Sequence, residues 1–322
     1  MMSWFAQWIA SGNGELLTQD YSKAKVYSLL VLGLVSFGFA PILVKLVTNY
    51  SALQITVIRT LFAFLFLVPV YIYQRQHEDK YVAPISKEGK LVFLAGFCLG
   101  LHFLLWIGSL YFTSVASASI LVTIHPIMLV IAERTIYKVN FPSTVWIGVL
   151  IAFAGSALLG YSDSNIDSDL ANPLLGNIMA FTAAVIFVVY FMIGRRVRQN
   201  RSWLGYVFPV YGYAALTCLV ILLVVEGIPD QIPVAVFLAG IGLAIGPQLM
   251  GHGAFNYAIK YISPTLLSTL ILAEPVFATI LAFFFFGEWP VALSFAAIFI
   301  IMGGISLSWI NKLRFRAKSQ NV

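Results

Sequence analysis

The sequence predicts an all-α integral membrane protein with ten transmembrane helices, arranged as two inverted five-helix repeats. Three observations support this fold class: ten apolar runs long enough to span a bilayer, basic residues that fall on one side of these runs, and a second half that matches the first. Of the 322 residues, 60% are hydrophobic and 10% are charged, and the mean hydropathy is +0.91. Because soluble domains are about a quarter charged, this composition excludes a soluble enzyme, a disordered chain and a nucleic-acid-binding protein.

The ten apolar runs follow one another along the chain with short connections. A helix needs roughly 20 apolar residues to cross a bilayer, and the connections at 74–89 and 161–173 are too short to hold a soluble domain. The predicted spans cover residues 26–47, 53–73, 90–112, 116–133, 143–160, 174–194, 203–226, 233–257, 263–286 and 291–310.

The basic residues predict the orientation of these spans. With the N-terminus in the cytoplasm, 17 of the 19 Lys and Arg residues lie on the cytoplasmic side, and Lys45 and Arg59 lie within spans 1 and 2. Cytoplasmic loops carry an excess of basic residues, so we expect a multi-pass protein of the cell inner (plasma) membrane with both termini cytoplasmic. The expected organisation is a cytoplasmic tail at 1–25, a first repeat at 26–160 (spans 1–5), an external linker at 161–173, a second repeat at 174–310 (spans 6–10) and a basic cytoplasmic tail at 311–322.

The two halves of the chain match at a nearly constant offset. Because each half holds an odd number of spans, the second half starts from the opposite side of the membrane. Inverted repeats of this kind are typical of secondary transporters, with the substrate site near the midplane. A duplicated fold without a transport role is the alternative. An offset of 149 pairs Ser114 with Ser263, Pro126 with Pro275 and Gly155 with Gly304, and an offset of 150 pairs Phe37 with Phe187, Gly96 with Gly246 and His102 with His252.

Span 9 carries a motif that resembles a known family. It reads Leu272-Ala273-Glu274-Pro275-Val276-Phe277 and then Phe286-Gly287-Glu288, which is similar to the closing motif of EamA-type transporters of the drug/metabolite transporter (DMT) superfamily. The first-half counterpart, His125-Pro126-Ile127 ending at Glu133-Arg134, looks like a degenerate copy. Arg59 matches an Arg that the family places in its second span, and 113–118 looks like the usual start of span 4.

This resemblance covers residues 26–310 as two EamA units. It implies ten helices around a central cavity, alternating access, and export of amino acids or other small metabolites. It also implies that spans 5 and 10 are peripheral, where a homodimer contact could form. The chain departs from the family at Ser36-Phe37-Gly38, where span 1 often carries Trp-Gly, so the substrates of relatives cannot be transferred to it.

Polar side chains within the spans predict the lining of the cavity. Such groups are costly in hydrocarbon and usually face a cavity or pair with one another. Span 3 places Cys98, His102 and Trp106 on one helix face, and span 8 presents a matching polar face. Prolines in spans 4 and 9 free backbone carbonyls near Val122 and Ile271. The predicted substrate-binding residues are Arg59, His102, Trp106, His125, Gln248, His252, Asn256 and Glu274.

Several of these residues have alternative roles. Arg59 could bind a carboxylate or phosphate, or could extend to the interface or pair within the bundle. Glu274 could carry a proton, bind a substrate amine or cap the broken helix. The histidines could carry coupling protons, because histidine titrates near neutral pH. The basic cluster at 195–201 could bind anionic lipid or form an ordinary cytoplasmic loop.

Catalytic motifs are absent from the sequence. There is no GxxxxGK[ST], no HExxH and no GxSxG, and Cys98 and Cys218 form no disulfide or metal pattern. We therefore expect no enzyme activity, no cofactor and no metal. The predicted function is a secondary active transporter that exports a small metabolite such as an amino acid, with proton coupling left open. The alternatives are a passive facilitator or channel for a small solute, or an importer of a nucleobase-like or amine compound. The expected partners are the small-molecule substrate, membrane lipid and a second copy in a homodimer, with no nucleic acid.

Overall fold

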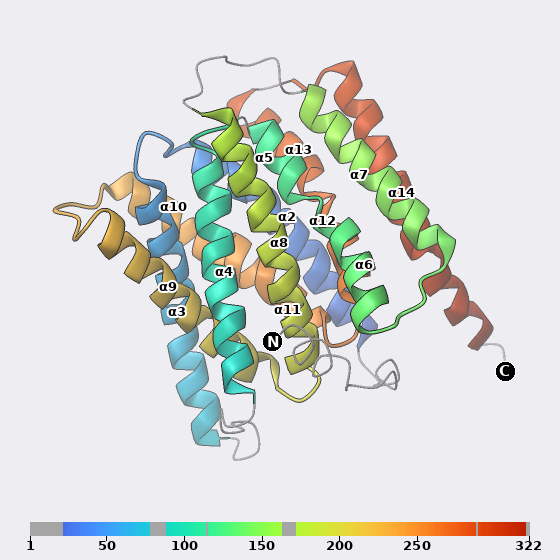
Figure 1. Cartoon of the computed structure of the whole chain (residues 1–322), viewed down its shortest axis with the longest axis horizontal. Helices are drawn as coiled ribbons and strands as arrows, with labels where there is room; N and C mark the ends of the chain where they lie inside the picture. The colour runs from blue at the N-terminus through green and yellow to red at the C-terminus, as the bar shows by residue number, and fades with distance from the viewer. Residues whose placement is uncertain (1–21, 78–87, 114, 163–171, 288, 320–322) are drawn as a thin grey trace.

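Long apolar helices make up the regular structure of the protein. The computed structural model describes residues 22–77, 88–113, 115–162, 172–287 and 289–319, and all regular elements within these ranges are helical (Figure 1). Nine helical segments in these ranges are long and apolar enough to cross a membrane, and the apolar stretch Ser143–Leu159 is shorter. Most of the predicted N-terminal tail and of the linker at 161–173 lies outside the described residues.

The helix bounds follow the predicted spans to within a few residues, except that the last helix continues to Ser319, through most of the segment predicted as a cytoplasmic tail at 311–322. Three of the predicted spans are interrupted. Span 4 is α5 and α6, span 8 is α10, the π-helix η1 and α11, and span 9 is α12 and α13. The helices of the first half are α2 (Lys23–Lys45), α3 (Ala52–His77), α4 (Gly89–Ser109), α5 (Val115–Val122), α6 (His125–Ile136) and α7 (Ser143–Ser162). Those of the second half are α8 (Pro173–Val197), α9 (Trp203–Val225), α10 (Val234–Leu243), η1 (Ala244–His252), α11 (Gly253–Ala258), α12 (Pro264–Ile271), α13 (Glu274–Phe286) and α14 (Ala292–Ser319).

Local sequence explains where several of these helices begin. Ser22, Asn172, Ser202 and Ser263 precede helices, and each side-chain oxygen accepts a hydrogen bond from the backbone N–H three residues later. Such caps satisfy one of the four N–H groups that have no partner inside a helix. Polar capping residues therefore place these helix starts at the ends of the apolar runs.

The interruptions occur at equivalent positions in the two halves. α5 and α12 each contain eight residues. The first residue of α12 lies 149 positions after the first residue of α5, and the same offset separates their last residues. The helices that follow them begin at His125 and Glu274, which keep the same offset. Lys138 and Gly287, also 149 apart, both have a positive φ, of 57° and 70°. The offset seen in the sequence is thus repeated in the helix geometry.

This register corrects one sequence-based assignment. Because Gly287 is equivalent to Lys138, the first-half counterpart of Glu288 is Val139. Glu133 precedes that position by more than a helical turn, so the assignment of Glu133-Arg134 to the closing motif is wrong. The offset of 149 residues in the sequence and the left-handed residue that ends both helices agree on this register.

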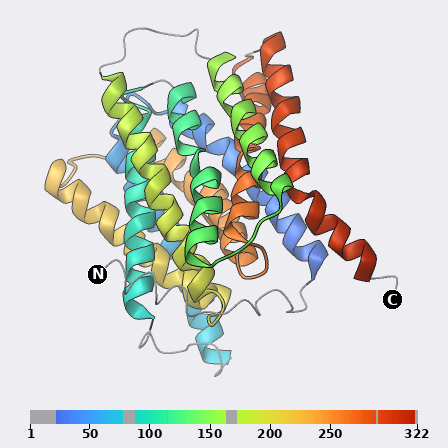
Figure 2. The same cartoon turned by 45° about the vertical axis from the view of Figure 1, so that its right-hand side comes forward.

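Glycines allow α7 and α14 to pack closely at one side of the bundle, where both views show them side by side (Figures 1 and 2). A Cβ on Gly148 would lie 2.5 Å from the backbone nitrogen of Ser308, and a Cβ on Gly304 would meet the backbone nitrogen of Ala152. These small residues therefore bring the two helix backbones into contact.

The neighbouring residue Gly303 gives a test of this contact, because a Cβ there would meet nothing within 4 Å. We expect Gly304→Ala to destabilise the protein by about 1–3 kcal/mol through overpacking. Gly303→Ala should be neutral, or stabilising by up to about 1 kcal/mol through helix propensity. Thermal unfolding of the two purified variants in detergent measures the difference, and equal melting temperatures would contradict the contact.

Candidate substrate site

A narrow cavity lies between the two halves of the chain, beside both pairs of broken helices. Side chains fill most of it and leave about 50 Å³, room for little more than water, so the structure describes a contracted cavity. Its wall includes Phe37 and Ala40 from α2, and Pro247 from η1. Six of the eight predicted site residues also line it: Arg59, His102, Trp106, His125, His252 and Glu274.

Much of the wall consists of residues at equivalent positions in the two repeats. The residues that end α5 and α12, and those that begin α6 and α13, contribute to it as pairs. Arg59 has no such counterpart, since the equivalent position in the second half is Pro209, and it makes the cavity asymmetric. The paired wall residues are Phe37 with Phe187, His102 with His252, Val122 with Ile271, and His125 with Glu274.

The break between α5 and α6 is stabilised by the imidazole of His125. Pro126 cannot donate to the carbonyl of Val122, as predicted, and the Nδ1–H of His125 donates to that carbonyl oxygen instead, at 2.8 Å. This bond fixes the tautomer, so Nε2 is an acceptor. Nε2 is buried without a hydrogen-bond partner among the described residues. His125 therefore has a structural role and also offers an unused acceptor in a wall residue of the cavity.

Arg59 provides a buried positive charge in the wall, with only 1% of its surface exposed. Its Nε donates to Oε1 of Gln248 at 3.2 Å, and its Cζ lies 3.8 Å from the ring centroid of Phe103. Its Nη1 has no hydrogen-bond partner among the described residues. Since an unsatisfied buried donor is costly, the arrangement is complementary to an acceptor, above all an anionic group.

Aromatic rings and histidines surround this charge. The Nδ1–H of His102 donates to the carbonyl oxygen of Ala183 at 3.0 Å, which fixes its ring. His252 contacts Phe37 edge-on, with centroids 4.9 Å apart, and Phe187 contacts His125 at 4.7 Å. Sequence reasoning did not select Phe37, Phe103 or Phe187 as site residues. The pairing of Phe37 with Phe187 in the repeat was a usable signal, whereas Phe103 had none.

Two predicted site residues lie behind the wall. Gln248 and Asn256 are fully buried. Gln248 holds Arg59, and the Asn256 amide pairs with the Tyr190 hydroxyl at 2.6–2.8 Å. The prediction assumed α-helical spacing through span 8. The π-helix changes the angle between successive side chains, so Gln248 does not share the cavity-facing position of His252.

One end of the bundle is closed by buried hydrogen bonds that the predicted basic cluster makes with neighbouring segments. We call it the basic end. Arg195 donates to the carbonyl oxygen of Ile259 at 2.9 Å, and Arg198 donates to that of Asn256 at 2.9 Å. Burial lowers the pKa of Arg198 to about 10, which still leaves it charged at neutral pH. These arginines join the end of α8 and the residue that follows it to α11 and Ile259.

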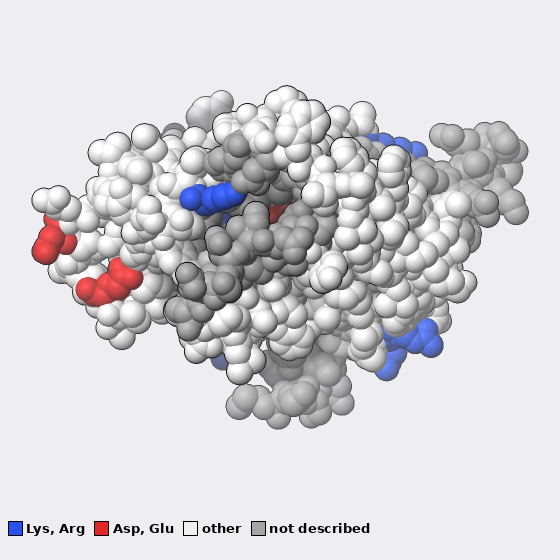
Figure 3. Space-filling model, turned by 90° about the horizontal axis from the view of Figure 1, so that it is seen from above, with Lys and Arg blue, Asp and Glu red and all other residues white. Residues whose placement is uncertain are grey.

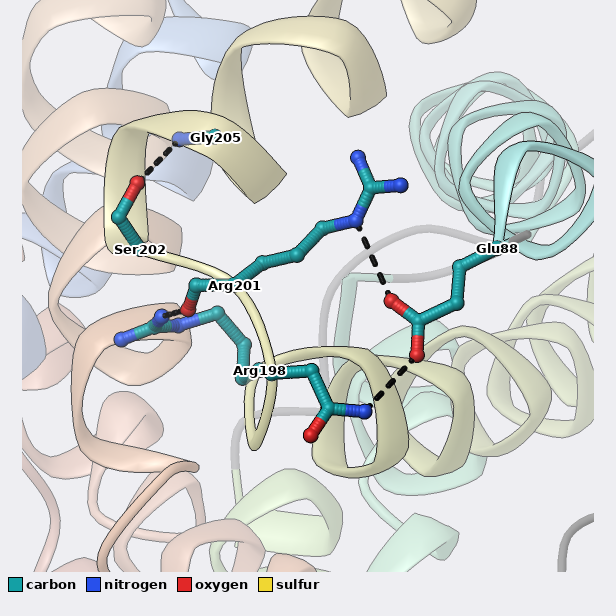
Figure 4. Close-up of polar contacts among 6 residues, drawn as sticks. Glu88, Arg198, Arg201, Ser202 and Gly205 are labelled. Carbon is teal, nitrogen blue, oxygen red and sulfur yellow. Dashed lines mark hydrogen bonds and ion pairs between the residues drawn. The ribbon is translucent and has the colours of Figure 1, made fainter. Parts of the chain in front are cut away.

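The connection after α8 also binds the start of α4. Arg201 donates from Nε to Oε2 of Glu88 at 3.2 Å (Figure 4), and Asn200 donates to Oε1 of this carboxylate at 3.1 Å. Ser202 then caps α9 through Gly205 (Figure 4). Arg195, Arg198 and Arg201 therefore bind the protein itself, and their role is to fix the closed end of the bundle.

Glu133 joins the two halves at this end. The carboxylate is 2% exposed, and its Oε2 accepts a hydrogen bond of 2.7 Å from the backbone N–H of Thr265, in the first turn of α12. The N-terminus of a helix favours a negative charge. Glu133, at the end of a first-half helix, is therefore an N-terminal cap for a second-half helix.

The opposite end of the bundle carries few charges. Figure 3 shows that it is largely uncharged, with basic and acidic atoms visible near its centre. Its hydrogen bonds join the segments between helices: Ser51 donates to Glu226 at 2.6 Å, and Tyr111 donates to the carbonyl oxygen of Tyr50 at 2.7 Å. Burial, and then the nearby Glu226, raise the pKa of Tyr111 to about 12.

Comparisons with known proteins match both halves of the chain. The family model for EamA-like transporters matches residues 24–161 and again 174–310. YdfC of Bacillus subtilis, described as an uncharacterized transporter, is 25% identical over 71% of this chain and 75% of its own length. An uncharacterized transporter of Archaeoglobus fulgidus is 23% identical over 87% of this chain and 94% of its own length. A crystal structure of 18% identity superposes with a TM-score of 0.72 over 91% of this chain and 99% of its own, which shows the fold alone.

The closure at the basic end can be tested at Glu133. We expect Glu133→Ala to destabilise the protein by about 1–3 kcal/mol, because it removes the partner of a buried backbone N–H. The control is Arg134→Ala, since this adjacent side chain is exposed. Melting temperatures of both variants in detergent measure the effect, and an unchanged value for Glu133→Ala would rule out this capping role.

Proposed function

Because the chain belongs to the EamA-like transporter family, we propose that it is a secondary active transporter that moves a small metabolite through the central cavity by alternating access. The observation that carries this proposal is that buried Arg59 and His125 and half-buried Glu274 line one cavity between equivalent helix breaks. Ionisable groups at membrane depth mark substrate and ion pathways, and broken helices supply such sites in transporters.

The helix geometry supports an inverted repeat with ten spans. α7 has 20 residues and is about 30 Å long at 1.5 Å per residue, which matches the hydrocarbon core. Counting α7 gives five spans in each half, and an odd number reverses the second half. Two inverted halves around one site can exchange their conformations, and this exchange opens the cavity to one side and then to the other.

The closed basic end supports a direction for this exchange. With the basic end in the cytoplasm, both termini lie on the cytoplasmic side of the inner membrane. The bonds of Glu133, Arg195 and Arg201 then close the cytoplasmic side of the cavity. Export requires these bonds to break so that substrate enters from the cytoplasm. A passive channel is less well supported, since a continuous path would need this end to stay open.

The unused polar atoms favour a substrate that carries both an acceptor and a donor. Nη1 of Arg59 fits a carboxylate, Nε2 of His125 fits an N–H or O–H group, and Glu274 fits an amine. The rings of Phe37, Phe103 and Phe187 fit an apolar portion. An amino acid combines these features, and we propose this class for the first transport assays.

Substrate recognition can be tested with Arg59→Gln in proteoliposome counterflow. Removing one member of a buried charge pair costs about 2–5 kcal/mol. For a carboxylate substrate, we therefore expect the substrate concentration that gives half-maximal counterflow to rise about 30-fold or more. Lys90→Gln is the control, because Lys90 is exposed at the start of α4. Equal apparent affinities for Arg59→Gln and the unmodified protein would contradict the role of Arg59.

Proton coupling by the histidines is a separate proposal. His102 and His252 lie with ring centroids 6.3 Å apart in the cavity wall. We expect His102→Ala and His252→Ala to lose the dependence of transport on an imposed pH gradient, while counterflow without a gradient continues. If both variants keep the full dependence on the proton gradient, the histidines do not carry the coupling protons.

A further inference from the structure

A second recess lies on the outer surface of the bundle, away from the cavity. It is formed by α2, the start of α9, and the η1–α11 segment, and contains about 780 Å³ of space not filled by atoms. We call it the α2–α11 groove. Since helices that cross the membrane form its walls, its opening faces the lipid. Its lining includes Lys25, Leu29, Leu32, Trp203, Met250 and Tyr257.

The groove is deep because small residues form part of its wall. Gly253 and Ala254 lie in α11, and a Cβ on Gly253 would lie 3.4 Å from the indole of Trp203. Leu32 and Met250 remain 52% and 43% exposed at its rim. Lys25 and Leu32 are seven residues apart on α2, which places them about 10 Å apart along the helix axis. An elongated apolar recess of this length, parallel to a transmembrane helix, fits part of an acyl chain.

One end of the groove is polar and aromatic. The Nζ of Lys25 lies 5.3 Å from the ring centroid of Tyr257, and the Nε1–H of Trp203 donates to the carbonyl oxygen of Gly253 at 2.8 Å. Tyr257 contacts Tyr261, with centroids 5.7 Å apart. Trp and Tyr gather at the headgroup level of membranes, so this end lies where a lipid headgroup would be.

The charge around this end is positive. Lys23 and Lys25 are exposed in the first turn of α2. Anionic headgroups are attracted to such basic clusters beside a membrane helix.

We propose that the α2–α11 groove binds an anionic phospholipid. Its phosphate is held by Lys25 at the aromatic end, and one acyl chain lies over Leu29, Leu32 and Met250. A peptide fits less well, because the walls are apolar and would leave its backbone groups without partners.

The position of this lipid links it to the cavity. Met250 faces the groove, while His252, on the same π-helix, lines the cavity. π-helices are rare and are frequently found at functional sites. An acyl chain in the groove would pack against η1 on the side opposite the cavity and stabilise the π-helix. This consequence for transport rests on the proposed function, whereas the binding of the lipid does not.

The test compares phosphatidylglycerol with phosphatidylcholine as added lipids for the full chain purified in detergent. Lipid adducts are counted by native mass spectrometry, and melting temperatures are recorded with each lipid. We expect more adduct and a larger increase in melting temperature with phosphatidylglycerol. Lys25→Gln should weaken phosphatidylglycerol binding about fivefold, the factor expected for one basic residue at an anionic surface. Lys90→Gln, which removes an exposed lysine that does not line the groove, should not.

A second variant, Met250→Trp, fills the groove and should reduce adducts of both lipids. The melting temperature of each variant without added lipid shows whether it is folded. Equal adducts for the unmodified protein and Lys25→Gln, or equal binding of the two lipids, would overturn the proposal. Because no transport is measured, a negative result leaves the proposed transporter function standing, and a failure to find transport leaves the lipid site standing.

Discussion

Backbone hydrogen bonding inside the bilayer is the constraint on which the structure depends. Hydrocarbon offers no partner for a free N–H or C=O, so a spanning segment must be helical or must satisfy its free groups internally. The described spans are interrupted in three places, within spans 4, 8 and 9, and residues at each interruption line the cavity. At the first of them, His125 satisfies the carbonyl of Val122 that Pro126 cannot reach. The breaks and the cavity are therefore one feature of the fold.

The position of the buried Arg59 guanidinium also depends on one of these interruptions, the π-helix η1. Gln248 holds its Nε from the π-helix, and Phe103 covers one face of its guanidinium. This leaves Nη1 as the unused donor of a rigidly placed group. The asymmetry of the cavity therefore depends on one residue of the first half and one π-helix of the second.

The two ends of the bundle differ in how they are held closed. At the basic end, buried arginines bind backbone carbonyls, and Glu133 binds a helix N-terminus in the other repeat. At the opposite end, the bond between Ser51 and Glu226 is exposed to solvent. Exposed polar contacts contribute less than buried ones, so the energetic cost of opening is greater at the basic end. Residues of η1 line both the cavity and the α2–α11 groove, so η1 lies between the two proposed sites.

The sequence by itself determined the approximate spans, the 149-residue offset and six of the residues that line the cavity. These properties depend on local rules: the length of apolar runs, proline chemistry and the cost of ionisable groups in hydrocarbon. His102, His125, His252 and Glu274 could be found in this way. Phe103 could not, because its role arises from the position of Arg59 on another helix.

Only the tertiary structure decided the roles of Gln248, Asn256 and Glu133. Gln248 and Asn256 were predicted as wall residues with α-helical spacing. The π-helix, which no local pattern signalled, moved Gln248 behind the wall, and Asn256 in α11 is buried against Tyr190. Glu133 looked like part of a repeated motif, yet its partner, Thr265, is 132 residues away in sequence. Periodicity describes which face a residue occupies along one helix. Which residue of another helix meets that face depends on packing between segments far apart in the chain.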